Sequence, residues 1–175
     1  LGDKLTAFAP NTTGIPYFKG KTSMSMEILK QLYDVGNLID VAEDCALVKT
    51  TFALFAASEL KYRGSKENVD AVIEDIYQTA LCLVSRGSVG NGHFEELQTG
   101  IQRVSRFIFS ETFYIDKAIT AASKAAYLTV LLRSENAVIE KYEDPKIMKD
   151  WSIGEPHWPK LNKLKKSNPV AFFYW

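Results

Sequence analysis

The feature that most constrains this fold is a run of 128 residues without proline, between Pro16 and Pro145. Few β-rich domains of this size contain such a run, because turns between strands recruit proline. The apolar residues within the run recur every three or four positions, which is the period of one face of an α-helix. We therefore predict an all-α fold, a single antiparallel bundle of four or five helices joined by short loops.

The first half of the bundle is predicted to contain two helices. The first spans about residues 24–35 and is interrupted at Gly36. The second spans residues 38–62, and a row of alanines widens its apolar seam. Because its only charge between Ala46 and Ser58 is Lys49, we expect it to be the most buried helix of the protein.

The second half of the bundle begins after Gly64, which is placed to end the preceding helix. Ser65 is predicted to cap a third helix over residues 66–85. After a glycine-rich turn, residues 92–144 are predicted to form a long core helix or a broken pair of helices. Their seam follows helical spacing and consists of Phe94, Leu97, Ile101, Val104, Ile108, Ile115, Ile119, Ala122, Ala126 and Val130.

Two segments of different character flank the bundle, which we place at residues 24–144. Residues 1–23 contain two prolines and three glycines, so we predict an extended N-terminal arm that packs against something. Residues 145–175 contain all three tryptophans and six lysines, and we predict an extended, aromatic, lysine-rich C-terminal arm. Large aromatic side chains are typical anchors of interfaces. The predicted partner-binding residues are Tyr17, Phe18, Trp151, Trp158, Phe172, Phe173, Tyr174 and Trp175.

The net charge of the chain is zero, but the charge is unevenly distributed. Residues 24–144 carry 12 basic and 18 acidic side chains, a net of −6, whereas the flanks carry 9 and 3, a net of +6. An acidic body argues against a nucleic-acid-binding bundle, which needs a basic face for phosphate. The distribution fits arms that fold back onto their own body or bind an acidic neighbour. No apolar run is long enough to span a bilayer, although peripheral association with a membrane complex is compatible with the sequence.

The residue types that carry catalysis or bind metals are sparse. Cys45 and Cys82 lie on predicted apolar faces and are expected to be buried free thiols. The bundle contains no Glu-x-x-His pair of the kind that builds a carboxylate-bridged metal site. His93 and His157 have no nucleophile motif around them. We expect neither a metal nor a cofactor.

Arg86 and His93 form an Arg-x6-His spacing that resembles the catalytic motif of HEPN ribonucleases. Members of that family are all-α and often dimeric. The resemblance implies that the arginine steadies the scissile phosphate while the histidine acts in acid–base chemistry. Here Gly87 occupies the position where the family has a polar residue. The alternative is a turn arginine followed by a histidine at the start of a helix.

The sequence favours a non-catalytic structural or accessory subunit that docks into a larger protein assembly through its arms, with other protein subunits as partners. An extended arm followed by a bundle is similar to the layout of PsbQ-type extrinsic subunits of photosystem II. One alternative is a HEPN-like ribonuclease that uses Arg86 and His93. Another is a bundle that holds an apolar ligand or pigment, for which the alanine-rich helix faces leave room. Residues 82–84 and 94–115 are similar to the later helices of phycobiliproteins, but the cysteine context that anchors the bilin in that family is missing. The sequence leaves open whether the C-terminal arm packs on its own bundle or on a partner.

Overall fold

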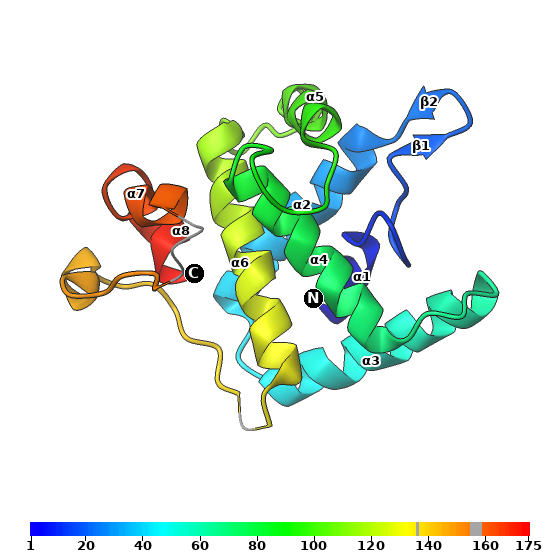
Figure 1. Ribbon diagram of the computed structural model, residues 1–175, viewed down its shortest axis with the longest axis horizontal. Coiled ribbons are helices and arrows are strands. Elements are labelled where there is room, and N and C mark those ends of the chain that lie inside the picture. The colour runs from blue at the N-terminus through cyan, green and yellow to red at the C-terminus, as the bar shows by residue number, and fades with distance from the viewer. Residues whose placement is uncertain (136, 155–158) are drawn as a thin grey trace.

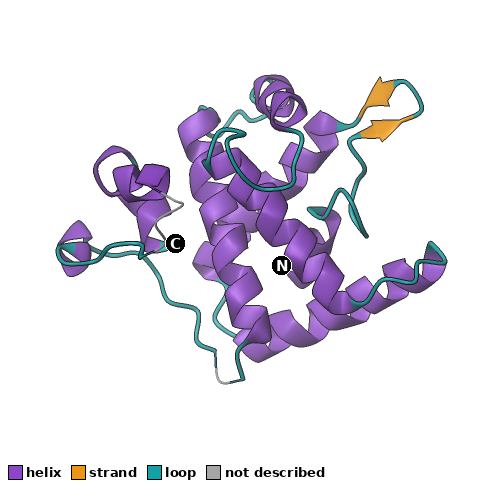
Figure 2. Ribbon diagram, in the orientation of Figure 1, coloured by secondary structure: helices purple, strands orange, loops and turns teal. Residues whose placement is uncertain are grey.

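The computed structural model describes residues 1–135, 137–154 and 159–175, and its main elements are helices, as predicted (Figure 1). Their bounds in chain order are α1 Gly2–Ala7, α2 Ser25–Val41, α3 Cys45–Tyr62, α4 Val69–Val84, α5 Phe94–Val104, α6 Ile115–Arg133, the 3-10 turn η1 Pro145–Met148, α7 Pro159–Ser167 and α8 Pro169–Phe173. The only strands in the described ranges are β1 Phe18–Lys19 and β2 Thr22–Ser23, an antiparallel hairpin (Figure 2).

Helices α4 and α6 run side by side through the centre of the molecule (Figure 1). Helix α2 packs against both α5 and α6, while α1 packs between α2 and α3. Helix α3 lies across one end of this group, and its C-terminal half projects away from the body. No described helix has both the length and the apolar content needed to cross a bilayer.

Helix α2 continues through Gly36, so the predicted interruption at this residue is wrong. The glycine instead allows close helix packing, because a Cβ at Gly36 would lie only 2.7 Å from the Cβ of Ala121 on α6. Gly100 has the same role between α5 and α2, since a Cβ there would lie 2.4 Å from the carbonyl oxygen of Ser25. Both glycines set the distance between helices rather than ending one.

The other helix boundaries agree with the sequence in part. Gly64 follows α3 with a φ of +60°, the left-handed conformation expected of a glycine after a helix. The next helix starts at Val69 rather than residue 66, because Asn68 and not Ser65 is its N-cap and accepts a hydrogen bond from the Ala71 amide. Of the two alternatives for residues 92–144, the broken pair is confirmed as α5 and α6.

The prediction that residues 1–23 are extended is wrong for their first third, which forms α1. Proline restricts the residues around it, and α1 ends before Pro10 is reached. Leu5 and Phe8 are fully buried. Gly2 packs on α3 so closely that a Cβ would lie 2.6 Å from the amide nitrogen of Phe52. This segment is therefore part of the core.

The prediction of an extended C-terminal arm is also wrong, because η1, α7 and α8 form within residues 145–175. Each of these elements begins at a proline, at Pro145, Pro159 and Pro169. The first helical turn tolerates proline, since its amide would have no partner within the helix. Asn168 caps α8 by accepting a hydrogen bond from the Ala171 amide at 3.2 Å.

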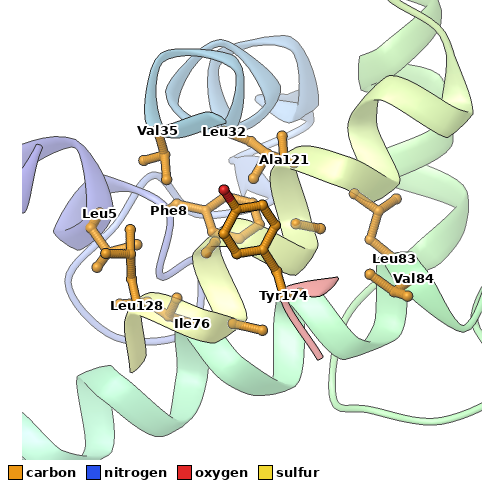
Figure 3. Packing of buried hydrophobic residues seen from close by; sticks show 14 of the residues in the cluster. Leu5, Phe8, Leu32, Val35, Ile76, Leu83, Val84, Ala121, Leu128 and Tyr174 are labelled. Carbon is orange, nitrogen blue, oxygen red and sulfur yellow. The ribbon is translucent and has the colours of Figure 1, made fainter. Parts of the chain in front are cut away.

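One continuous hydrophobic cluster connects both ends of the chain to the helices between them. Figure 3 shows Phe8 from the N-terminal segment and Tyr174 from the last residues, together with Leu32, Ile76 and Leu128 from α2, α4 and α6. These five side chains are at most 4% exposed. The two flanks thus complete the core that the central helices begin.

The side chain of Lys124 on α6 is buried, and its ammonium group donates three hydrogen bonds to α2. Its ammonium group donates to both carboxylate oxygens of Asp40 at 2.7 Å and to the carbonyl oxygen of Gly36 at 2.9 Å. The lysine side chain is 8% exposed, whereas that of Asp40 is 52% exposed. The pair therefore joins α6 to α2 with a buried cation and a half-hydrated anion.

This asymmetry predicts unequal costs for removing the two partners. Asp40→Ala should lower the free energy of unfolding by about 2–3 kcal/mol, because it leaves a buried ammonium group without its counter-charge. Lys124→Met should cost less, about 1 kcal/mol, because Asp40 can be hydrated and the methionine fills the same space. Urea unfolding of both variants measures the difference. A larger loss for Lys124→Met would contradict this account of the pair.

Candidate functional site

Arg86 and His93, the two residues of the HEPN-like spacing, make different contacts in the structure. Arg86 lies beyond the end of α4 with a φ of +55°, and its guanidinium donates to Asp116 of α6 at 3.3 Å. His93 is the N-cap residue of α5, with its ring 5.8 Å from that of Tyr17 and 6.0 Å from that of Phe18. In the described part of the chain, no hydrogen bond or ring contact joins Arg86 to His93. Each residue thus has a local structural partner.

Beside His93, the buried hydroxyl of Tyr17 makes no hydrogen bond of good geometry with the described residues. Burial raises the pKa of Tyr17 to about 12. The thiol of Cys82 is also buried, and burial raises its pKa as well. Nucleophilic cysteines need the opposite shift, because the thiolate is the reactive form. The side chains around His93 therefore pack the hairpin segment against α4, and neither Tyr17 nor Cys82 is activated as a nucleophile.

Tyr17→Phe is expected to raise the free energy of unfolding slightly at pH 7, by up to about 1 kcal/mol, because it removes a poorly bonded buried hydroxyl. In the native protein this tyrosine keeps its proton until about pH 12, whereas it ionises near pH 10 when unfolded. The ionisation of Tyr17 leaves the free energy of unfolding unchanged below pH 10. Between pH 10 and pH 12 it lowers that free energy, because only the unfolded chain loses the tyrosine proton in this range.

Urea unfolding from pH 7 to pH 11 should therefore show a smaller alkaline loss of stability in the Tyr17→Phe variant than in the native chain. Tyr127→Phe is the matched control, because that hydroxyl has partners, the Val138 carbonyl and the Glu140 amide. Removing it should lower the free energy of unfolding at pH 7. Parallel pH curves for Tyr17→Phe and the native chain would contradict the buried position of Tyr17.

Most of the predicted partner-binding residues near the C-terminus pack on their own body. Phe172 and Tyr174 are 3% and 4% exposed. Trp175 donates its indole N–H to the hydroxyl of Ser123 on α6 at 2.8 Å. Phe173 is half-buried and stacks on Trp151 with ring centroids 5.9 Å apart. In this structure these aromatic residues hold the C-terminal segment against α6.

A smaller set of predicted contact residues remains accessible. Phe18 on the hairpin and Trp151 after η1 are each 45% exposed, and Ile147 in η1 is 51% exposed. Trp158, another predicted contact residue, lies outside the described residues. Of the predicted contact residues that the structure describes, Phe18 and Trp151 are therefore the exposed ones.

The basic charge of the flanks is largely left unpaired. Among the residues that the structure describes, the one ion pair between a flank and residues 24–144 joins Lys4 to Asp34 at 2.9 Å. The exposed C-terminal lysines lie on or beside η1 and α7: Lys146, Lys149, Lys163 and Lys166. Together with Ile147 and Trp151, we call them the basic C-terminal surface.

Two open hollows flank α3, and neither is an internal ligand cavity. One of about 450 Å³ lies beside its N-terminal half and is lined by residues that include Leu38, Val41 and Leu47. The other, of about 550 Å³, lies between α1 and its C-terminal half. The alanines of α6 that suggested room for a pigment are packed, as the contact of Ala121 with Gly36 shows. No cluster of metal-ligating side chains occurs among the described residues.

The prediction that residues 38–62 form the most buried helix is wrong. Helix α3 buries one narrow face, formed by Cys45, Val48, Phe52, Ala56 and Leu60. On its other side Leu47 is 63% exposed, Leu54 is 64% exposed and Tyr62 is 89% exposed. A helix that is apolar all round is normally covered all round. The all-round apolar pattern of α3 is visible in the sequence, but it does not specify whether the residues that cover the helix belong to the same chain.

In comparisons with known proteins, no family model, curated protein or solved structure matches this chain. The likeness of Arg86 and His93 to the HEPN motif thus rests on their spacing alone.

Proposed function

We propose that this protein is a non-catalytic structural or accessory subunit that docks into a larger protein assembly. The observation that carries the proposal is the unpaired basic charge of the flanks, where Lys4 alone forms an ion pair with residues 24–144 among the described residues. If the arms served only to hold the helices of this chain together, we would expect their lysines to form ion pairs with the acidic residues of the body. An acidic surface on another protein would complement them.

The composition of the basic C-terminal surface supports this reading. Trp151 and Ile147 are half-exposed apolar side chains in the same segment as the exposed Lys146 and Lys149. Aromatic anchors with a charged rim are typical of protein interfaces. The segment is also held in a defined position, because Lys165 donates to the carbonyl oxygens of Lys149 and Trp151 at 2.6 and 2.9 Å. A surface that is ordered before binding loses less entropy when it binds.

The roles of the buried polar groups are consistent with a non-catalytic function. Asp75 is 7% exposed and accepts hydrogen bonds from the backbone and side-chain amides of Asn11 and the hydroxyl of Thr12. It therefore ties the N-terminal segment to α4. Lys124 is fully engaged by α2. These buried groups join elements of the fold.

The proposal includes the scaffold that presents this surface. We infer a single antiparallel bundle in which α2, α4, α5 and α6 are the main helices. It is supported by the packing of α4 on α6 and of α2 on both α5 and α6. Helices α4 and α6 also run in opposite directions (Figure 1). On this scaffold the C-terminal segment lies along α6 and presents its lysines outward.

The test is co-isolation of partners with the tagged full-length chain, expressed in the organism that makes it. The double variant Lys163→Glu/Lys166→Glu should lose at least tenfold of a partner that is stoichiometric with the native chain. Lys66→Glu/Arg106→Glu is the matched control, because it makes the same change in net charge at two exposed residues outside the flanks.

Equal thermal unfolding midpoints for the two double variants would show that both are folded. Equal partner recovery with both, or the absence of any stoichiometric partner, would contradict the proposal.

A further inference from the structure

The connection between α5 and α6, residues 105–114, contains a group of exposed apolar side chains (Figure 1). Phe109 is 94% exposed and Phe107 is 59% exposed, while Ile108 between them is half-buried. We call these three consecutive residues the aromatic tip. Grouped apolar side chains of this kind mark a contact with another protein or with a membrane.

The fold holds the aromatic tip in a defined position from both sides. Before the tip, Val104 is buried, and its carbonyl oxygen accepts a hydrogen bond from the Phe107 amide at 2.9 Å. After the tip, Phe113 is buried, and its ring packs on that of Tyr33 with the centroids 5.3 Å apart. The exposure of the tip is therefore a property of the folded chain, and binding through it costs little ordering entropy.

Basic side chains lie next to the aromatic tip. Arg103 and Arg106 are exposed and belong to one turn, in which the Arg106 amide donates to the Arg103 carbonyl oxygen at 3.3 Å. The ammonium group of Lys30 on α2 lies 5.3 Å from the centre of the Phe107 ring. In the described part of the chain, none of these three cations forms an ion pair.

The charge around the tip is opposite in sign to that of the helical body, which carries a net of −6 over residues 24–144. The one acidic residue within residues 103–114 is Glu111. Its carboxylate is paired with the ammonium group of Lys117 at 3.0 Å, so it does not neutralise the arginines. The surroundings of the tip therefore complement an anionic surface.

We propose that the aromatic tip, together with Arg103, Arg106 and Lys30, binds the surface of a bilayer that contains anionic lipids. The two phenylalanines enter the boundary between headgroups and acyl chains, and the arginines bind lipid phosphate groups. The side chains of the tip contain no hydrogen-bond donor or acceptor, so they offer no polar pattern by which one particular protein would be recognised. A bilayer needs only the two properties that this surface has, exposed apolar side chains and positive charge.

The proposed bilayer contact is separate from the basic C-terminal surface, because α2 and the connection between α5 and α6 form it. It goes beyond the docking proposed above and does not depend on it. The variant Lys66→Glu/Arg106→Glu should keep the protein partner but weaken vesicle binding, so the two proposals can fail independently.

Flotation of the full-length chain with lipid vesicles tests the proposal. Phosphatidylcholine vesicles in which a quarter of the lipid is phosphatidylserine should bind the chain at least tenfold more strongly than pure phosphatidylcholine vesicles. Phe107→Ser/Phe109→Ser should weaken this binding at least tenfold, because it removes the apolar contact. Leu54→Ser/Tyr62→Ser is the matched control, since both side chains are more than 60% exposed on α3, and it should leave binding unchanged.

The charged part of the surface has its own test. Arg103→Glu/Arg106→Glu should weaken vesicle binding at least tenfold, whereas Lys163→Glu/Lys166→Glu makes the same change in net charge elsewhere and should leave it unchanged. Equal thermal unfolding midpoints would show that the variants are folded.

Three results would overturn the proposal. The first is equal binding of the native chain to the two kinds of vesicle, or no binding to either. The second is a loss of vesicle binding in Lys163→Glu/Lys166→Glu but not in Arg103→Glu/Arg106→Glu. The third is Phe107→Ser/Phe109→Ser that binds vesicles as the native chain does but loses a protein partner on co-isolation, which would assign the tip to a protein contact.

Discussion

Replacing Phe8 by alanine is expected to lower the free energy of unfolding by about 3–5 kcal/mol. The ring is fully buried in the cluster that contains Leu32 of α2 and Leu128 of α6. The cost has two parts, the lost burial of the ring and the cavity that remains. Such a loss is a large share of the total stability of a domain, which is about 5–15 kcal/mol. Urea unfolding followed by circular dichroism measures it.

Phe18→Ala is the control for this experiment, because it removes the same side chain from the same flank at a residue that is 45% exposed. It should cost about 1 kcal/mol or less. A separate melting transition for residues 1–23, or equal small losses for both variants, would show that Phe8 is not part of the common core.

Ending the chain after Asn168 is expected to be more disruptive than any single substitution. This truncation removes α8 together with the buried Phe172, the buried Tyr174 and Trp175, which is bonded to Ser123. At about 1.5–3 kcal/mol for each buried side chain, the expected loss is about 5–9 kcal/mol. The loss is comparable to the whole stability of the domain, so the truncated chain should be largely unfolded at 25 °C.

Because an unfolded truncation is uninformative alone, Tyr174→Ala and Trp151→Ala provide graded comparisons. Tyr174→Ala removes a ring that is 4% exposed and should cost about 3–5 kcal/mol, whereas Trp151→Ala removes one that is 45% exposed and should cost far less. Thermal unfolding by calorimetry measures both. A truncated chain with a native melting temperature would contradict the packing of the C-terminal segment on α6.

The helical class of this fold could be predicted from the sequence because its signal is local. The proline-free run and the three-to-four-residue period describe the backbone of the body itself. Gly64 as the end of a helix and Cys45 and Cys82 as buried free thiols are confirmed for the same reason, since each follows from a residue and its near neighbours.

The failures have a common physical cause, which is that periodicity shows which face of a helix is apolar but not what covers it. Helix α3 was expected to be buried because its apolar pattern is wide, yet α1 covers only one face. Gly36 was expected to break a helix, but it instead meets Ala121 on α6, a contact between residues 85 positions apart. The prolines of residues 1–23 are interpreted as helix breakers, whereas Pro145, Pro159 and Pro169 in the C-terminal flank begin helical turns.

For the candidate contact surfaces as well, the sequence shows the residue types but not where the fold places them. The basic and aromatic character of residues 145–175 is visible in the sequence. Composition does not show that Tyr174 lies in the core while Trp151 remains half exposed, because both are large aromatic residues in the same segment. The sequence therefore supplied the residue types of a docking surface, and the packing of the chain determines which of them are available.

The most direct test of the central claim, that this chain is a subunit of a larger assembly, is native mass spectrometry with lysine cross-linking on untagged protein from its natural source. The account predicts a mass above that of one chain or its dimer, with cross-links from Lys163 or Lys166 to a different polypeptide. A free monomer or homodimer, whose lysines are cross-linked only to other lysines of the same sequence, would contradict it.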